Sequence, residues 1–436
     1  MSTTSLALRS LLAQAAARTK LDANVQLLAG LSPAARALAV AVAARRSRHL
    51  TLVVVPTDKD VDVLVSDLRF FLAALEGASD LDVRQSVLGF PSWQVDPYRG
   101  MTPHFRVASA RARALYGAAC NTAKVVVASA AALLPRVSGA ERLLRAAADL
   151  APGTEIDPQV LADRLTDGGF TREDPVEEHG TFTIRGGIVD VFPAGDAEPV
   201  RVEFVGDQVE SMRRFDPATQ RSTGSVDRLV VVPVRERFED DTDLLSAVDA
   251  FGTASGLDLL IVEADLVDQQ LNGTRDQLDA AYADATARGP VTVGAPLEVF
   301  ADAAAISQRL ASGRRFEELA LGDDGVPHVA CQPSMEFRGR VGDWIADIRQ
   351  ARQRGDTVLF VAESSGRAER VVEIFRDYDI VAVPLDRAED AHAAGVLVCV
   401  GQLSRGFRLA DAALQIYVES DVFEAVSYTH LRAHET

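Results

Sequence analysis

The chain is short of cysteine, of lysine and of long apolar runs. Its three cysteines lie far apart, at Cys120, Cys331 and Cys399, which excludes a disulfide framework and the spacing of a metal knuckle. Scattered thiols are typical of a reducing cytosol, so we expect a cytoplasmic protein. No apolar run reaches the ~18 residues that a membrane helix needs. The N-terminus lacks the leading positive charge and the cleavage site of a signal peptide.

Positive charge is also in deficit, with 45 basic against 63 acidic residues and a net charge of −18. Such a chain is a poor candidate for coating nucleic acid, because that kind of binding neutralises phosphates. A local basic patch stays possible. The 47% of hydrophobic residues allow a sizeable core, and the length suits about three domains at ~150 residues each.

The first ~135 residues alternate between buried strands and helices, which predicts a parallel sheet covered on both faces. Helices are expected from Pro33 to about Arg46, and from Thr57 or Asp58, as N-cap, to about Leu75. The predicted strands are Val25 to Leu31, Leu50 to Val55, Ser86 to Phe90 and Lys124 to Ala128.

The pattern then changes to short strands and turn signals between Gly180 and Val234, which predicts a mostly antiparallel insert. Alternation places Phe182 and Ile184 on one face of a strand, and Thr181, Thr183 and Arg185 on the other. A second strand places Val200, Val202 and Phe204 opposite Arg201 and Glu203. If the apolar faces form the core, Phe204 is buried and both Arg185 and Arg201 face solvent.

From about Asp240 the α/β rhythm returns. The expected elements are a strand at Leu259 to Val262, a helix at Ala264 to Ala285, a loop with a short strand at Ala287 to Gly294, a helix at Val341 to Arg354, a strand at Thr357 to Ala362, a helix at Arg367 to Tyr378, and strands at Ile380 to Val383, Val396 to Val400 and Leu414 to Val418. We divide the chain into 1–136, an insert at 137–237, a return to the first domain at 238–326, and a further α/β domain at 327–426. Residues 427–436 fit no pattern and are interpreted as a non-native tail.

The stretch Gly30 to Ala37 follows a strand and begins a helix, where a phosphate-binding loop G-x-x-x-x-G-K-[ST] would lie. Ala35 replaces its second glycine and adds a Cβ where the backbone must approach phosphate. Arg36 replaces the compact charge of lysine, and Ala37 has no hydroxyl for magnesium. We interpret the stretch as a phosphate loop that has lost its function. An ordinary strand–helix turn, or a loop that still binds nucleotide, stays open.

A second degenerate motif ends the strand at Leu259 to Val262. In a working ATPase that strand ends in Asp-Glu, where the Asp holds magnesium and the Glu positions the attacking water. Here Glu263 takes the Asp position and Ala264 replaces the catalytic Glu. A core strand that happens to end in an acid is the alternative. Together the two motifs predict no ATP hydrolysis by this chain. We also expect no catalytic residue, no bound cofactor and no metal.

Several runs carry a family resemblance. They are Phe90 to Tyr98, Thr102 to His104, the long run EHG-x-x-x-x-RGG-x-x-D-x-FP from Glu178 to Pro193, Pro199 to Phe204, and Arg214 to Asp216. Through them the chain resembles the N-terminal part of the bacterial transcription-repair coupling factors (Mfd), and it is similar to the excision-repair helicase UvrB. The resemblance implies a RecA-like (P-loop NTPase-type) domain that is interrupted by an antiparallel α+β insert and followed by a further α/β domain.

The resemblance also implies function. In both families the insert docks the damage-recognition protein UvrA, and its exposed arginines match Arg172, Arg185 and Arg201; Thr183 departs from UvrB, which has a basic residue there. Routine salt bridges, for example with Glu203 or Glu177, are the alternative for these arginines. In the whole coupling factor, ATP and magnesium drive a translocase that acts on double-stranded DNA and displaces stalled RNA polymerase. We expect this part to bind UvrA. We also expect it to inhibit that translocase by packing against it within the whole protein. A UvrB-like ATPase and an isolated α/β scaffold are the competing interpretations.

Other candidates are weaker. Trp93, Tyr98 and His104 are interpreted as a structural loop, and His179 as a turn residue rather than a metal ligand. Arg106, Arg111 and Arg113 lie close to helical spacing and are expected on a solvated helix face.

Overall fold

The computed structural model describes residues 3–21, 25–193, 195–238, 240–252, 256–319, 326–385 and 395–423. The predicted tail at 427–436 lies outside them. The chain forms two compact units, which we describe separately. Unit 1 contains Met1–Arg46, Val63–Val83 and Arg315–Thr436, and unit 2 contains Ser47–Asp62 and Arg84–Arg314. In the described residues no helix is long and apolar enough to cross a membrane.

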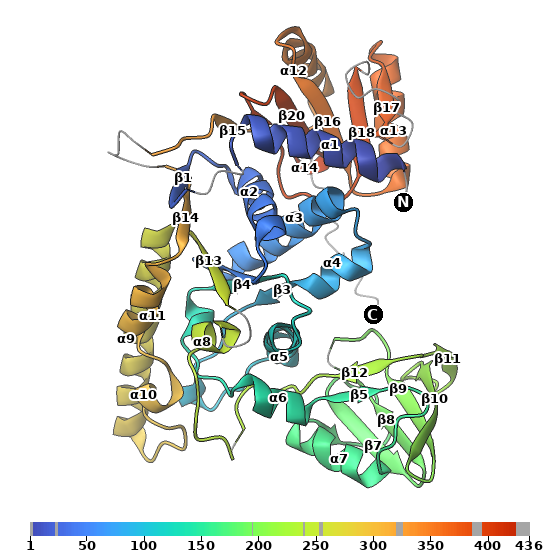
Figure 1. Cartoon of the computed structure of the whole chain (residues 1–436), viewed down its shortest axis with the longest axis vertical. Helices are drawn as coiled ribbons and strands as arrows, with labels where there is room; N and C mark the ends of the chain where they lie inside the picture. The colour runs from blue at the N-terminus through green and yellow to red at the C-terminus, as the bar shows by residue number, and fades with distance from the viewer. Residues whose placement is uncertain are drawn as a thin grey trace, which may run out of the picture. The chain divides into compact units, whose positions relative to one another are not determined.

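Unit 2 contains a buried parallel sheet, which confirms the expected α/β class (Figure 1). Its strands are β2 (Leu50–Val55), β3 (Val87–Phe90), β4 (Val125–Ser129) and β13 (Leu257–Val262), in the order β13-β2-β4-β3. The helices of this part are α4 (Asp80–Ser86), α5 (Phe105–Ala119), α8 (Ala247–Gly252), α9 (Ala264–Arg288), α10 (Pro296–Val299) and α11 (Ala303–Leu310).

Two details of this part bear on the predictions. Thr57 caps α3 (Asp58–Glu76), because its Oγ1 accepts from the Asp60 nitrogen at 3.4 Å; in return the Thr57 nitrogen and Oγ1 donate to Asp60 Oδ2 at 3.0 and 2.7 Å. The short strand expected within Ala287 to Gly294 is wrong, since α9 continues to Arg288 and a loop follows.

The insert is a six-stranded sheet in the order β11-β10-β9-β8-β7-β6, antiparallel except where β6 pairs parallel with β7. Its core takes Phe182, Val202 and Phe204, so the predicted burial of Phe204 is confirmed. The strands are β6 (Thr171–Arg172), β7 (Thr181–Arg185), β8 (Ile188–Val191), β9 (Val200–Val205), β10 (Gln208–Phe215) and β11 (Ser222–Ser225). Helices α6 (Ala140–Ala146) and α7 (Pro158–Asp167), and the strand pair β5 (Ala148–Leu150) and β12 (Leu229–Val231), complete this region.

Unit 1 contains α1 (Thr3–Arg18), α2 (Pro33–Arg46) and a parallel pair of β1 (Leu27–Ala29) with β14 (Arg314–Glu317). Its C-terminal sheet has the order β15-β19-β20-β16-β18-β17 and a core around Trp344. The strands are β15 (Cys331–Pro333), β16 (Thr357–Ala362), β17 (Ala382–Pro384), β18 (Val396–Val400), β19 (Phe407–Leu409) and β20 (Leu414–Val418), and the helices are α12 (Val341–Gln353), α13 (Ser365–Asp377) and α14 (Glu419–Val422). Strands β15 and β19 were not expected from the sequence.

Candidate partner-binding face and degenerate nucleotide loop

One face of the insert sheet is polar, and we call it the outer face. The strand register aligns Thr183, Asp190, Arg201 and Arg213 across β7, β8, β9 and β10. Because side chains alternate along a strand, this row lies opposite the apolar core. The outer face is therefore where the insert presents charged groups.

A buried ion pair occupies the middle of the row. Arg201 Nε and Nη2 each donate to a different carboxylate oxygen of Asp190 at 2.8 Å. The Asp190 side chain is 1% exposed and that of Arg201 is 23% exposed. The hydrogen bonds to Asp190 raise the pKa of Arg201 above its usual value. Two charge-assisted hydrogen bonds thus hold the Arg201 guanidinium on the Asp190 carboxylate.

A small second layer covers part of the outer face. Val176, Phe192 and Phe215 form a separate apolar cluster, and the Arg201 guanidinium lies 4.8 Å from the centre of the Phe215 ring. Thr181 and Thr183 are buried as well. The prediction that Arg201 faces solvent is therefore wrong, because alternation identifies the face but not what covers it.

Arg185 and Arg172 remain accessible. Arg185 is 49% exposed, as predicted, and its Nη2 lies 3.0 Å from Asp174 and 3.7 Å from Asp190. Arg172 is exposed on the edge strand β6, in register with Phe182 rather than with the outer-face row, and its Nη2 donates to the Ile184 carbonyl at 3.3 Å. Exposed guanidinium groups with donors to spare can bind carboxylates of a partner in a forked geometry.

The outer face also carries its own acids. Glu203 accepts from Ser211 Oγ at 2.5 Å and lies 3.4 Å from Arg213. The expected salt-bridge partners of Arg185 and Arg201 were Glu203 or Glu177, whereas the structure pairs them with Asp174 and Asp190. Sequence reasoning missed Asp190, because an acid between Val189 and Val191 is what alternation predicts for a solvent-facing position.

The chain segment 328–331 packs against the loop that follows β1. Gly30 has φ +87°, and a Cβ there would overlap the Val329 carbonyl oxygen and the His328 ring. The Val329 nitrogen donates to the Ala29 carbonyl at 2.8 Å, and Ser32 Oγ lies 3.3 Å from Cys331 Sγ. The absence of a side chain at Gly30 thus allows the chain segment 328–331 to approach closely.

The substituted positions of this loop are buried. Ala35 and Ala37 are fully buried, and Arg36 is 7% exposed with Nη2 donating to the Leu31 carbonyl at 3.4 Å. A phosphate-binding loop instead offers open backbone N–H groups to its ligand. The geometry therefore agrees with an inactive loop and with close packing of a strand–helix turn.

The second degenerate motif lies in unit 2. Glu263 is the N-cap residue of α9 and has a left-handed backbone, with φ 52° and ψ 67°. Ala264 begins the helix and packs on the apolar core. Gly30 belongs to unit 1 and Glu263 to unit 2.

The structure corrects the prediction for Arg111. Its side chain is 1% exposed, donates from Nε to Glu236 at 2.7 Å and from Nη1 to the Pro91 and Ala132 carbonyls, and lies 3.9 Å from the centre of the Phe90 ring. This arginine is a core group rather than part of a solvated helix face.

The aromatic and histidine candidates have structural partners. Trp93 Nε1 donates to Glu236 at 2.5 Å, and Tyr98 donates to the Gly294 carbonyl at 3.2 Å. His104 caps α5, and the His179 ring stacks with Phe105 and Phe192. Within the described ranges no group of His, Cys, Asp and Glu side chains could hold a metal ion.

Two family models match the chain. The UvrB interaction domain matches residues 148–236, the region that folds into the insert sheet. The MFD D3 domain matches residues 351–422 in the C-terminal α/β domain. The resemblance to transcription-repair coupling factors, and to UvrB through the insert, is thereby confirmed.

Curated relatives agree with these models. The transcription-repair-coupling factor of Bacillus subtilis is 23% identical over 92% of this chain and 38% of that protein. The one from Myxococcus xanthus is 33% identical over 52% of this chain and 18% of that protein. UvrABC system protein B of Mannheimia succiniciproducens is 32% identical over 36% of this chain and 23% of that protein. The chain thus spans well under half the length of these relatives.

Proposed function

We propose that this chain is the UvrA-docking part of a transcription-repair coupling factor, and that exposed arginines of its insert sheet make the contact. The observation that carries the proposal is the match of the UvrB interaction domain to the sheet on which Arg172 and Arg185 are exposed. The assembled protein would displace stalled RNA polymerase from double-stranded DNA and recruit UvrA. Its ATP-driven translocase would lie outside this chain, and this part would restrain it by intramolecular packing.

The geometry assigns different tasks to the three arginines. Arg172 and Arg185 would pair with UvrA carboxylates directly, because both are exposed. Arg201 would act through Asp190, which it holds in place. Electrostatic pairs at an interface contribute to orientation and to association rate, so loss of the two exposed charges should weaken docking strongly.

The test is the double charge reversal Arg172→Glu/Arg185→Glu, with Arg221→Glu as the matched control. Arg221 is an exposed arginine just before β11. We expect the double variant to lose at least ~30-fold in affinity for UvrA while its circular dichroism is unchanged, and the control to bind normally. Equal binding by the double variant and the wild type would refute docking through these two arginines.

We also propose that this chain neither binds nor hydrolyses ATP. The support is the buried loop at Gly30 to Ala37, with Arg36 in place of lysine, and Ala264 in place of the catalytic acid. Calorimetry with Mg-ATP should give no heat of binding at millimolar nucleotide. Tight magnesium-dependent binding would contradict this proposal and favour the UvrB-like ATPase, which the similarity to UvrABC system protein B keeps as the alternative.

A further inference from the structure

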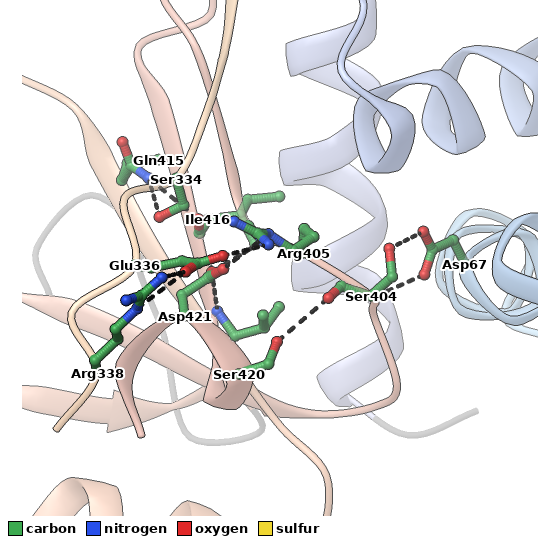
Figure 2. A network of polar contacts seen from close by, with 12 residues as sticks. Asp67, Ser334, Glu336, Arg338, Ser404, Arg405, Gln415, Ile416, Ser420 and Asp421 are labelled. Carbon is green, nitrogen blue, oxygen red and sulfur yellow. Dashed lines mark hydrogen bonds and ion pairs between the residues drawn. The ribbon is translucent and has the colours of Figure 1, made fainter. Parts of the chain in front are cut away.

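Helix α3 contacts the loop between β18 and β19 through a buried aspartate (Figure 2). Asp67 is 0% exposed. Its Oδ1 accepts from the Ser404 backbone nitrogen at 2.7 Å, and its Oδ2 accepts from Ser404 Oγ at 2.6 Å. Both carboxylate oxygens therefore bind one residue of a loop that is 337 positions away in the sequence.

Apolar groups of the same helix turn complete this contact. Residues 67, 70 and 71 have the i, i+3, i+4 spacing that places side chains on one helix face. Phe70 lies so close to Gly401 that a Cβ on this glycine would overlap the ring. The Phe71 and Phe407 rings are 6.3 Å apart, centre to centre, and both are fully buried. One turn of α3 thus holds the loop at its start, its middle and its end.

A second buried aspartate holds the loop from its own domain. Asp421 is 0% exposed, and its Oδ2 accepts from the Gly406 and Val418 nitrogens at 2.9 and 3.0 Å. Arg405 lies 3.7 Å from Asp421 Oδ1 and 2.7 Å from Glu336. The loop is therefore fixed internally through Gly406 and externally through Ser404, by two independent carboxylates.

The external contact differs from the internal one in having no cation. Among the described residues, the hydrogen bonds to Asp67 come from Ser404, and no arginine or lysine pairs with it. Burial of an unpaired carboxylate is unfavourable and raises the pKa of Asp67 to about 6, although the bonds from Ser404 oppose this. An apolar residue would hold the loop more tightly, so this carboxylate favours a specific but releasable contact.

We propose that Asp67, Phe70 and Phe71 of α3 form a latch that closes on loop 401–407 and opens without unfolding the C-terminal α/β domain. Opening separates Asp67 from Ser404 and frees the apolar face of α3, while Asp421 continues to hold Gly406. The latch controls whether the C-terminal domain is attached to α3. Its residues all lie in unit 1, whereas the insert lies in unit 2.

Two backbone amides report the two anchors separately in hydrogen exchange of the whole chain. The Ser404 amide donates to Asp67, and the Gly406 amide donates to Asp421. In Asp67→Ala the Ser404 amide loses its acceptor, so we expect its exchange to accelerate about 10- to 100-fold. Exchange at Gly406 and in strands β16 and β20 should change less than threefold.

Asp67→Asn should behave in the opposite way. Its amide can accept from the Ser404 nitrogen and donate to Ser404 Oγ without a buried charge. At pH 7.5 we expect Ser404 protection equal to or greater than that of the wild type. Arg338→Ala is the matched control, because Arg338 is 74% exposed and pairs only with Glu336 among the described residues, at 3.2 Å. It should leave both amides unchanged.

Three results would overturn the latch. Unchanged Ser404 exchange in Asp67→Ala would show that the contact does not hold the loop. Equal acceleration at Ser404, Gly406 and the sheet strands would show that the domain unfolds as a whole. If Asp67→Ala fails to fold, Asp67→Asn decides: accelerated exchange of its Ser404 amide at pH 7.5 would contradict a latch weakened by its buried charge.

Discussion

Two buried aspartates of this chain have opposite surroundings. Asp190 on the insert accepts two hydrogen bonds from Arg201 at 2.8 Å, and Arg185 Nη2 lies 3.7 Å from Asp190 Oδ2. Asp67 on α3 receives two bonds from Ser404, which is neutral. The first carboxylate is part of an ion pair on the outer face. The second is a buried charge that has no counter-charge among the described residues.

The comparison shows why burial alone does not define the role of a carboxylate. A paired carboxylate becomes costly only when its cation is removed, whereas an unpaired one is costly in the native state. Substitutions at the two sites should therefore differ in size and in sign.

Removal of the cation beside Asp190 should have the largest effect. Arg201→Ala leaves Asp190 buried without its bidentate partner, so we expect a loss of about 3–4 kcal/mol in the free energy of unfolding. Urea unfolding followed by circular dichroism measures it. Arg213→Ala, at a 51% exposed arginine in the same strand register, should cost less than ~0.5 kcal/mol. Similar losses for both variants would contradict a structural role specific to Arg201.

The position of Arg201 in the structure also shows what the sequence could not predict. Alternation in β7 and β9 identified the correct faces, and the exposure of Arg185 and the burial of Phe204 follow from it. It could not show that Val176, Phe192 and Phe215 cover part of the outer face. That cluster joins residues far apart in the chain, and a local period of two carries no information on such contacts.

Neutral replacement of each aspartate tests whether the two negative charges contribute to stability with opposite sign. Asp190→Asn exchanges a charge-assisted fork for one neutral acceptor and should cost about 2 kcal/mol, because Arg201 then loses its counter-charge. Asp67→Asn should be neutral or stabilising at pH 7.5, since it removes an unpaired buried charge. The measurement is the urea midpoint of both variants at pH 7.5. Destabilisation of equal size in both would remove the distinction between the two aspartates.

The sequence did not identify Asp67 as a buried contact, and it placed Arg111 on a solvated helix face. Both are charged residues on faces of helices that turn inward, Asp67 beside Phe70 and Phe71 and Arg111 over Phe90. A helical pattern predicts that charged positions face solvent. The partners that make burial possible, Ser404 and Glu236, are distant in sequence. The strands and helices were readable because they are local, whereas these pairs were not.

The pH dependence at Asp67 is the smallest effect and the most specific one. Its pKa in the folded chain is about 6, above the ordinary 3.8, so the folded state binds this proton more tightly than the unfolded state does. Its destabilising contribution is therefore small below pH ~4, grows between pH ~4 and ~6, and is complete above. The unfolding free energy of Asp67→Asn minus that of the wild type should rise by about 1 kcal/mol from pH 5 to pH 7.5. The subtraction removes the titration of the other carboxyls, including Asp421, whose pKa burial also raises to about 6. A difference that stays constant or falls over this range would contradict a destabilised carboxylate at Asp67.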